Sequence, residues 1–288
     1  MKNTTFLLLF FCTVCVYGQR KNINSPEDDR PFVLGTITQI QSMILGEKRI
    51  LNIFLPEGYE ENRSLKYPVI YLLDGSADED FIHFTGLVQY NSFEWVNRVP
   101  KSIVVGIATV DRKRDFTFPT QIAEDVKRYP TAGHSDRFMR FIEEELQPFI
   151  AKKYRTSEDR TIAGQSLGGL FATEILLKKP ALFNRYIIVS PSIWWDNGSL
   201  LDQPTALLSN LLRPTEVYIG VGKEGLTPTA VPRVMEVDAN LLAEKLRNAK
   251  SKFLNVHFDY LPAEDHATIM HQAVSNAFQM IYEKPETE

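Results

Sequence analysis

The sequence predicts an α/β fold with a mostly parallel central sheet, helices on both faces and an antiparallel hairpin at the amino-terminal end. Three observations lead to this prediction. Beyond residue 56, short apolar runs alternate with longer amphipathic ones, which is typical of βαβ units. Most of the short runs are apolar on both faces, as parallel strands covered by helices are. Before them, two β-like runs over 32–45 and 48–55 flank Gly46-Glu47, which predicts the hairpin.

The elements of the parallel part follow in order along the chain. We expect strands at residues 68–73, 102–108, 161–163, 186–189, 216–221 and 254–261. Apolar residues recur at helical spacing over 136–154, 167–179, 205–212, 234–250 and 268–282, and we expect helices there. Residues 75–100 and 110–133 have no clear periodicity. Each follows an expected strand, so we expect both to form walls of a crevice at the carboxyl ends of the strands.

Composition excludes several classes of protein. The chain has 288 residues, is 44% hydrophobic and carries a formal net charge of −4, which fits a globular protein and argues against a nucleic-acid partner. Met1-Lys2 precedes an apolar run over 6–16 and the small residue Gly18, so residues 1–18 are expected to be a signal peptide. The mature chain, 19–288, would then be a single secreted or periplasmic domain. An uncleaved anchor is the alternative, although the run is short for a membrane span.

Both cysteines, Cys12 and Cys15, lie inside the expected signal peptide. The mature chain would therefore contain no disulfide, no thiolate nucleophile and no cysteine metal site. We expect it to act without a metal or another cofactor.

The run Gly164-Gln165-Ser166-Leu167-Gly168 lies where the β-like residues 160–163 meet a helical stripe. Gly-x-Ser-x-Gly between a strand and a helix is the pattern of a nucleophile elbow. The turn strains the serine backbone and projects its hydroxyl, and the flanking glycines leave room for so tight a bend. The following helix directs its free N–H groups at developing negative charge. We therefore interpret Ser166 as a nucleophile; a plain glycine-rich turn is the alternative.

A serine nucleophile needs a base, and the chain offers five histidines. Elbow-type hydrolases present serine, acid and histidine in that chain order, which excludes His83 and His134. His257 falls within an expected strand and His271 within an expected helix. His266 stands in a polar loop between the last strand and the last helix, where a base that faces the site is expected.

The acid should follow a strand that lies between Ser166 and His266 in the chain. Glu224 fits, because the strand at 216–221 ends in the turn Gly222-Lys223-Glu224-Gly225. Other acidic residues stay open as alternatives; these are Asp196, Asp202, Asp238 and Asp265.

An oxyanion hole would complete the machinery. The N–H of the residue after the nucleophile, Leu167, supplies one donor. The turn after residues 68–73 contains Asp74-Gly75-Ser76, and either Gly75 or Ser76 could supply the second. A plain turn is the alternative interpretation of this stretch.

These residues resemble a known family. LPEGY, YPVIYLLDG, RDFTFP, FIEEELQPFIAKKY, GQSLGGLFA, SPSIWW and AEDH together resemble the putative-esterase family of α/β-hydrolases. Its members include enterobactin-type siderophore esterases, feruloyl esterases, S-formylglutathione hydrolases and mycolyltransferases. SPSIWW and RDFTFP resemble the siderophore-esterase branch most. The resemblance implies an α/β-hydrolase fold without a metal, a nucleophile at Ser166, a base at His266 and an acid position in the turn that holds Glu224.

Two further stretches are candidates for substrate contact. Trp194 and Trp195 follow the strand expected at 186–189, and an aromatic wall would suit a planar or apolar acyl group. Ordinary core aromatics are the alternative. Arg112 is expected on the opposite wall, where a cation would suit an anionic substrate; a structural ion pair is the alternative.

The leading functional hypothesis is a serine carboxylic-ester hydrolase that acts through an acyl-enzyme on a small or medium ester, such as an aryl, sugar or siderophore ester. Acyl transfer to a sugar or alcohol would use the same machinery. A binding protein on a hydrolase scaffold is the third alternative, and it would have no need of an elbow.

Overall fold

The computed structural model describes residues 31–229 and 231–282. The chain divides into two units, with the boundary between Val33 and Leu34, and every element below belongs to the second unit. The expected signal peptide lies outside the described residues. None of the helices in the described ranges combines the length and the apolar composition needed to cross a bilayer.

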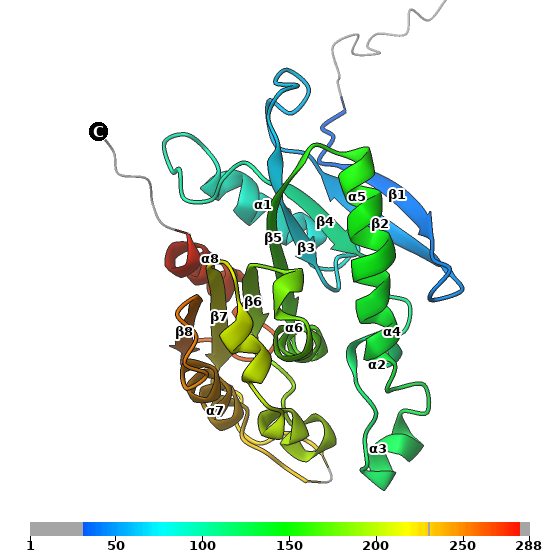
Figure 1. Ribbon diagram of the computed structural model, residues 1–288, viewed down its shortest axis with the longest axis vertical. Coiled ribbons are helices and arrows are strands. Elements are labelled where there is room, and N and C mark those ends of the chain that lie inside the picture. The colour runs from blue at the N-terminus through cyan, green and yellow to red at the C-terminus, as the bar shows by residue number, and fades with distance from the viewer. Residues whose placement is uncertain (1–30, 230, 283–288) are drawn as a thin grey trace, which may run out of the picture. The chain divides into compact units, whose positions relative to one another are not determined.

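Eight strands form one sheet, in the order β1-β2-β4-β3-β5-β6-β7-β8. The pairs β1–β2 and β2–β4 are antiparallel, and every other neighbouring pair is parallel. The strands are β1 (Thr36–Gln41), β2 (Lys48–Phe54), β3 (Tyr67–Leu72), β4 (Ile103–Ile107), β5 (Thr156–Gln165), β6 (Arg185–Val189), β7 (Thr215–Gly222) and β8 (Leu254–Leu261). The predicted hairpin and mostly parallel sheet are confirmed (Figure 1).

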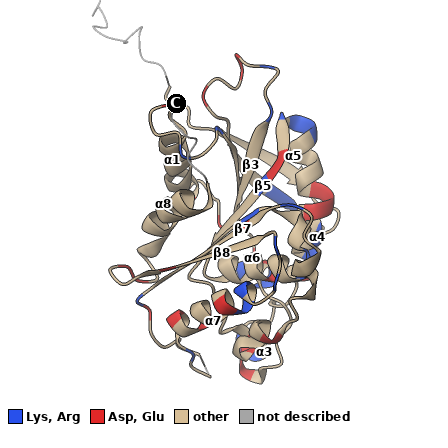
Figure 2. Ribbon diagram, turned by 60° about the vertical axis from the view of Figure 1, so that its left-hand side comes forward, with Lys and Arg blue, Asp and Glu red and all other residues tan. Residues whose placement is uncertain are grey.

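Helices cover both faces of this sheet. They are α1 (Phe81–Asn91), α2 (Arg112–Phe116), α3 (Ala123–Arg128), α4 (Ser135–Arg140), α5 (Gln147–Lys153), α6 (Leu167–Lys178), α7 (Met235–Arg247) and α8 (Ile269–Ile281). Figure 2 shows α1 and α8 together on one side of the strands, with α4 to α7 on the other. Each side has its own core: Phe84 of α1 meets Phe278 of α8 edge-on at 6.0 Å, whereas Phe171 of α6 packs against Phe138 of α4.

The long helix expected over 136–154 is present as three consecutive helical segments, α4, a π-helical turn at Phe141–Leu146, and α5. The helix expected over 205–212 is reduced to a short 3-10 segment, Ala206–Asn210. A longer helix would have little chain to occupy here, because β7 already begins at Thr215.

Helix α1 lies in the stretch 75–100, where no helix was predicted. Its inner face is helically spaced but includes the polar residues Thr85 and Asn91, while Ile82 and Tyr90 are exposed. Polar residues inside and apolar residues outside blur the period on which a sequence-based prediction depends. The stretch 110–133 likewise contains two short helices, α2 and α3.

The six strands from β4 to β8 in the sheet order are mutually parallel, so their carboxyl ends meet at one edge. Loops after β3, β5, β6, β7 and β8 therefore come together there. This edge carries the candidate active site.

Candidate active site

Ser166 occupies the single residue between the end of β5 and the start of α6. Its backbone has φ 58° and ψ −118°, a conformation that a serine adopts only when its surroundings hold it there. Gly164 makes the bend feasible, because a Cβ at this position would lie 2.7 Å from the carbonyl carbon of Gly168. The carbonyl of Ser166 accepts hydrogen bonds from the N–H groups of Leu170 and Ser192, which secures the turn on both sides.

His266 and Glu224 form a hydrogen-bonded pair. The Nδ1 atom of His266, in the loop after β8, lies 2.6 Å from Oε2 of Glu224, in the turn after β7. The Glu224 side chain is only 4% exposed, whereas that of His266 is 47% exposed. The pair thus has the arrangement of an oriented base: one ring nitrogen is held by a buried carboxylate, and Nε2 remains for chemistry.

Ser190 also helps to fix the carboxylate of Glu224. The Ser190 hydroxyl and, at 3.3 Å, the Gly222 N–H both donate to Oε1 of Glu224. Burial by itself would raise the pKa of Glu224, but the hydrogen bonds from His266 and Ser190 outweigh it and hold this pKa below its ordinary value. The carboxylate stays ionised where an ordinary glutamate takes up a proton, and the stability it contributes is lost only as the pH falls through its depressed pKa.

The backbone of the acid turn is fixed from two directions. The Glu236 carboxylate on α7 accepts from the N–H groups of Glu224 and Gly225, at 2.9 Å each. On the other side, the N–H of Lys223 donates to the carbonyl of Glu264 at 2.8 Å. A Cβ at Gly222 would lie 2.6 Å from that carbonyl oxygen, so glycine permits this close approach of the acid turn to the base loop.

Ser166 and His266 border the same two cavities. One, called here the Asp80 cavity, has a volume of about 400 Å³ and is lined by Asp74, Glu79, Asp80, Arg112, Gln165, Ser166 and His266. The other, the Trp194 cavity, has a volume of about 370 Å³ and is lined by residues that include Tyr129, Ser192, Trp194, Glu224 and Met235. An ester carbonyl beside Ser166 could therefore extend one group into each cavity.

The Ser166 hydroxyl makes its one side-chain hydrogen bond within the described residues to the Ser192 hydroxyl, at 3.2 Å, rather than to His266. Catalytic hydrogen bonds are often loose before substrate binds. The Gln165 amide donates to the backbone carbonyl of His266 and so ties the base loop to the residue next to Ser166.

The structure separates the two candidates for the second oxyanion donor. The N–H of Gly75 is engaged, since it donates to the carbonyl of Ile107 at 3.0 Å. The N–H of Ser76 has no acceptor within residues 31–229 and 231–282. Leu167 is the first residue of α6, so its N–H has no partner inside the helix. Of the three predicted donors, Leu167 and Ser76 are therefore the two whose N–H groups have no acceptor among the described residues.

The two predicted aromatic contacts differ in position. Trp194 lines the Trp194 cavity, as a substrate contact would. Trp195 is 1% exposed and its indole N–H donates to the carbonyl of Phe118 at 2.8 Å. Trp195 therefore packs in the core and holds the loop after β4. Its buried position differs from the substrate contact that the sequence predicted.

Arg112 borders the Asp80 cavity, but its charge is balanced. The Nε atom donates to both carboxylate oxygens of Asp74, at 2.9 and 3.0 Å, and an NH₂ group donates to the carbonyl of Gln165 at 3.1 Å. Arg112 thereby ties the turn after β3, which begins at Asp74, to the residue before Ser166. This is the ion pair that the sequence left open as the alternative to a cationic wall.

Sequence reasoning missed Ser190 and Ser192, which support the acid and contact the nucleophile, and the acidic residues Glu79 and Asp80. The run SPS directly after an expected strand at the carboxyl edge was a usable signal for the two serines. Within the described part of the chain, no group of three His, Cys, Asp or Glu side chains could hold a metal ion.

Comparison with known proteins identifies the family and the fold. Residues 42–268 match the family described as "Putative esterase". The ferri-bacillibactin esterase BesA of Bacillus subtilis is 32% identical over 248 residues, which are 81% of this chain and 85% of that protein. An IroE-like serine hydrolase from Shewanella oneidensis superposes with a TM-score of 0.77 at 29% identity, over 86% of this chain and 80% of its own. The BES protein of Bacillus cereus gives 0.76 at 30% identity, over 89% and 99%.

Proposed function

The chain belongs to the putative-esterase family and is a carboxylic ester hydrolase, and on this premise we propose that it acts through a covalent acyl-enzyme on Ser166. The observation that carries the proposal is the hydrogen bond between His266 and the buried Glu224, beside a strained serine that borders the same cavities. A binding protein would have no use for an oriented base beside a serine.

The proposed reaction has two halves. The Ser166 oxygen bonds to the ester carbonyl carbon while Nε2 of His266 takes the hydroxyl proton, and Glu224 stabilises the resulting imidazolium. The N–H groups of Leu167 and Ser76 stabilise the oxyanion. The imidazolium then gives its proton to the alcohol oxygen as the carbon–oxygen bond of the ester breaks. Water repeats the sequence on the acyl-enzyme and releases the acid.

For the substrate, we propose an ester of the siderophore type. The proposal is supported by the relatives, since BesA is named a ferri-bacillibactin esterase, and relatives from Emericella nidulans and Aspergillus fumigatus are named siderophore esterases. The test is a panel of a catecholate trilactone, feruloyl esters, acetylated sugars and short-chain nitrophenyl esters. We expect the trilactone to give the highest kcat/KM. A higher value for feruloyl or sugar esters would overturn the substrate proposal and leave the esterase mechanism in place.

Replacing the acid should give an intermediate loss. In Glu224→Gln the amide no longer stabilises an imidazolium, although Ser166 and His266 remain, so we expect kcat to fall by roughly 10²- to 10⁴-fold. Glu264→Gln is the matched control, because Glu264 lies in the base loop and its bond to the acid turn is made by its backbone carbonyl, which the substitution leaves in place. Steady-state hydrolysis of a nitrophenyl ester measures both. Equal rates in the two variants would mean that Ser166 and His266 work as a dyad or with another acid.

We also propose that the protein is exported and cleaved near Gly18. The proposal is supported by the Lys2-led apolar run in the sequence. Mass spectrometry of secreted or periplasmic material should find a chain that begins near Gln19. Recovery of the full-length chain from the cytosol would count against export.

A further inference from the structure

We propose that Ser192 is a further catalytic residue: its hydroxyl donates a hydrogen bond to Oγ of Ser166 and stabilises the negative charge that this oxygen carries during the reaction. This role rests on the proposed esterase function and adds a donor to the same site. It follows from the contacts that fix Ser192, from the burial of its hydroxyl, and from the distance between the two hydroxyl oxygens.

The backbone around Ser192 is held against the nucleophile elbow. Strands β5 and β6 are parallel neighbours, so Ser166 after β5 and Ser192 after β6 lie at the same edge of the sheet. The N–H of Ser192 donates to the carbonyl of Ser166 at 3.0 Å. The segment also lies close against α6, since a Cβ at Gly169 would lie 3.0 Å from Cα of Pro191. The Ser192 hydroxyl is therefore held in place by a fixed backbone.

Burial indicates which of the two hydroxyl groups donates. Ser192 is 1% exposed, and its hydroxyl has one hydrogen-bond partner among the described residues, Oγ of Ser166 at 3.2 Å. A buried hydroxyl proton needs an acceptor, and this oxygen is the one at hand. Ser166 has another acceptor for its own proton, because His266 borders the same cavities and offers Nε2. With Ser192 as donor, both protons have an acceptor and the base can still take the proton of Ser166.

The length of the bond suits a role in the transition state. At 3.2 Å the bond is longer than the usual O–H···O bond of about 2.7–2.8 Å. Bonds to an ionised oxygen are shorter and stronger than bonds between neutral groups. Charge develops on Oγ of Ser166 as its proton moves to His266, and again as Oγ leaves the acyl-enzyme. Ser192 keeps its own proton throughout. Its bond is weak at rest and strong during both half-reactions, which is the kind of interaction that raises kcat.

Ser192→Ala removes the donor and leaves the N–H that holds the elbow. We expect kcat for a nitrophenyl ester to fall by roughly ten- to a hundredfold, as for one lost hydrogen bond to a charged group, with KM nearly unchanged. Labelling of Ser166 by a small fluorophosphonate should slow by a similar factor. That reaction requires an activated Oγ but places no acyl or alcohol group in the Trp194 cavity, so it separates activation from substrate binding.

Ser192→Cys tests whether the hydroxyl acts by filling space. A thiol has nearly the same shape as a hydroxyl, but it is a weak hydrogen-bond donor. We therefore expect this variant to lose nearly as much kcat as Ser192→Ala. A rate close to that of the parent protein would show that Ser192 only packs beside the nucleophile, and would overturn the inference.

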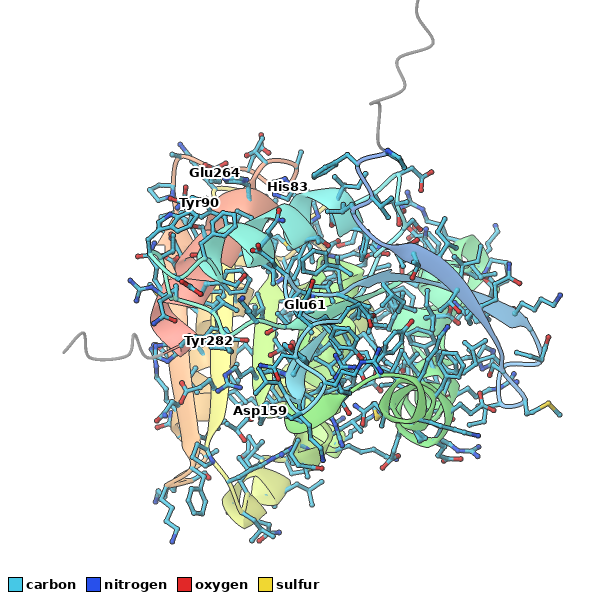
Figure 3. The ribbon with its side chains drawn as sticks, turned by 90° about the horizontal axis from the view of Figure 1, so that it is seen from above. Glu61, His83, Tyr90, Asp159, Glu264 and Tyr282 are labelled. Atoms are coloured by element: carbon cyan, nitrogen blue, oxygen red, sulfur yellow. The ribbon has the colours of Figure 1, made fainter. Side chains whose placement is uncertain are left out.

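Tyr282→Phe is the matched control for the loss of a buried hydroxyl. The Tyr282 hydroxyl lies 3.3 Å from that of Thr161 on β5, so it also belongs to a buried pair of hydroxyl groups. Figure 3 shows Tyr282 well apart from Glu264, which lies in the base loop. Even if this variant melts at a lower temperature, its kcat and its labelling rate should stay close to those of the parent protein.

The remaining outcomes separate the two proposals. An unchanged or higher kcat in Ser192→Ala would overturn the inference, because it would mean that Ser166 is the donor and that the bond withholds its proton from His266. A loss of equal size in Tyr282→Phe would also overturn it, because weakened packing would then explain both variants. A parent protein that hydrolyses no ester of the substrate panel would instead overturn the proposed function.

Discussion

Ser166→Ala should abolish turnover, with a fall in kcat of roughly 10⁴-fold or more, while the protein stays folded. The change removes one oxygen atom and leaves the elbow backbone, which is held by the contacts of Gly164 and by the carbonyl of Ser166, in place. Without the oxygen no acyl-enzyme can form. His266 and the oxyanion donors could then only weakly promote direct attack by water on the ester. Circular dichroism would check that the variant is folded, and hydrolysis of a nitrophenyl ester would measure its rate.

Labelling with a fluorophosphonate probe tests the same prediction at one atom, the hydroxyl oxygen of Ser166. Only a serine activated by a base and by oxyanion donors should react, so the parent protein should be labelled at Ser166 and the variant should not be labelled. Ser209→Ala is the control, because Ser209 is an exposed serine whose hydroxyl donates to the carbonyl of Ala206 and to no other acceptor among the described residues. Unchanged labelling in Ser166→Ala would return the glycine-rich stretch to the status of a simple turn.

His266→Ala should lose nearly as much activity as the serine variant. Its imidazole is the group that can accept the Ser166 proton, and removing any one member of such a unit costs several orders of magnitude. We expect the melting temperature to change little, because the His266 side chain is 47% exposed. Hydrolysis rates together with a thermal melt would separate lost chemistry from lost structure.

His257→Gln is the matched control for the base. His257 lies on β8 and its Nε2 atom is 3.0 Å from a carboxylate oxygen of Glu216, so it is engaged on the strand. Activity in that variant should stay close to that of the parent protein. A His266→Ala protein of near-normal activity would move the base to another histidine, and a loss in His257→Gln would point to this one.

The sequence by itself was enough to predict the parallel sheet, the elbow at Ser166, and the positions of Glu224 and His266 after the last two strands. These features depend on short-range causes. A strained turn needs glycine within two residues of the serine, a buried strand needs a short apolar run, and a site-facing loop directly follows its strand. Each of these causes involves only a few neighbouring residues, so it can be recognised in a single sequence.

Only the tertiary structure decided which atoms of these loops face the site. The Gly75 N–H donates to the carbonyl of Ile107, a residue of the neighbouring strand β4, whereas the Ser76 N–H has no acceptor in the part of the chain that the structure describes. Trp194 lines a cavity while Trp195 is turned into the core by the carbonyl of Phe118. Ser190 reaches Glu224 across 34 positions of sequence, because β6 and β7 are neighbours in the sheet. The orientation of a side chain in a loop depends on partners that the fold brings from distant parts of the chain, and no local pattern encodes them.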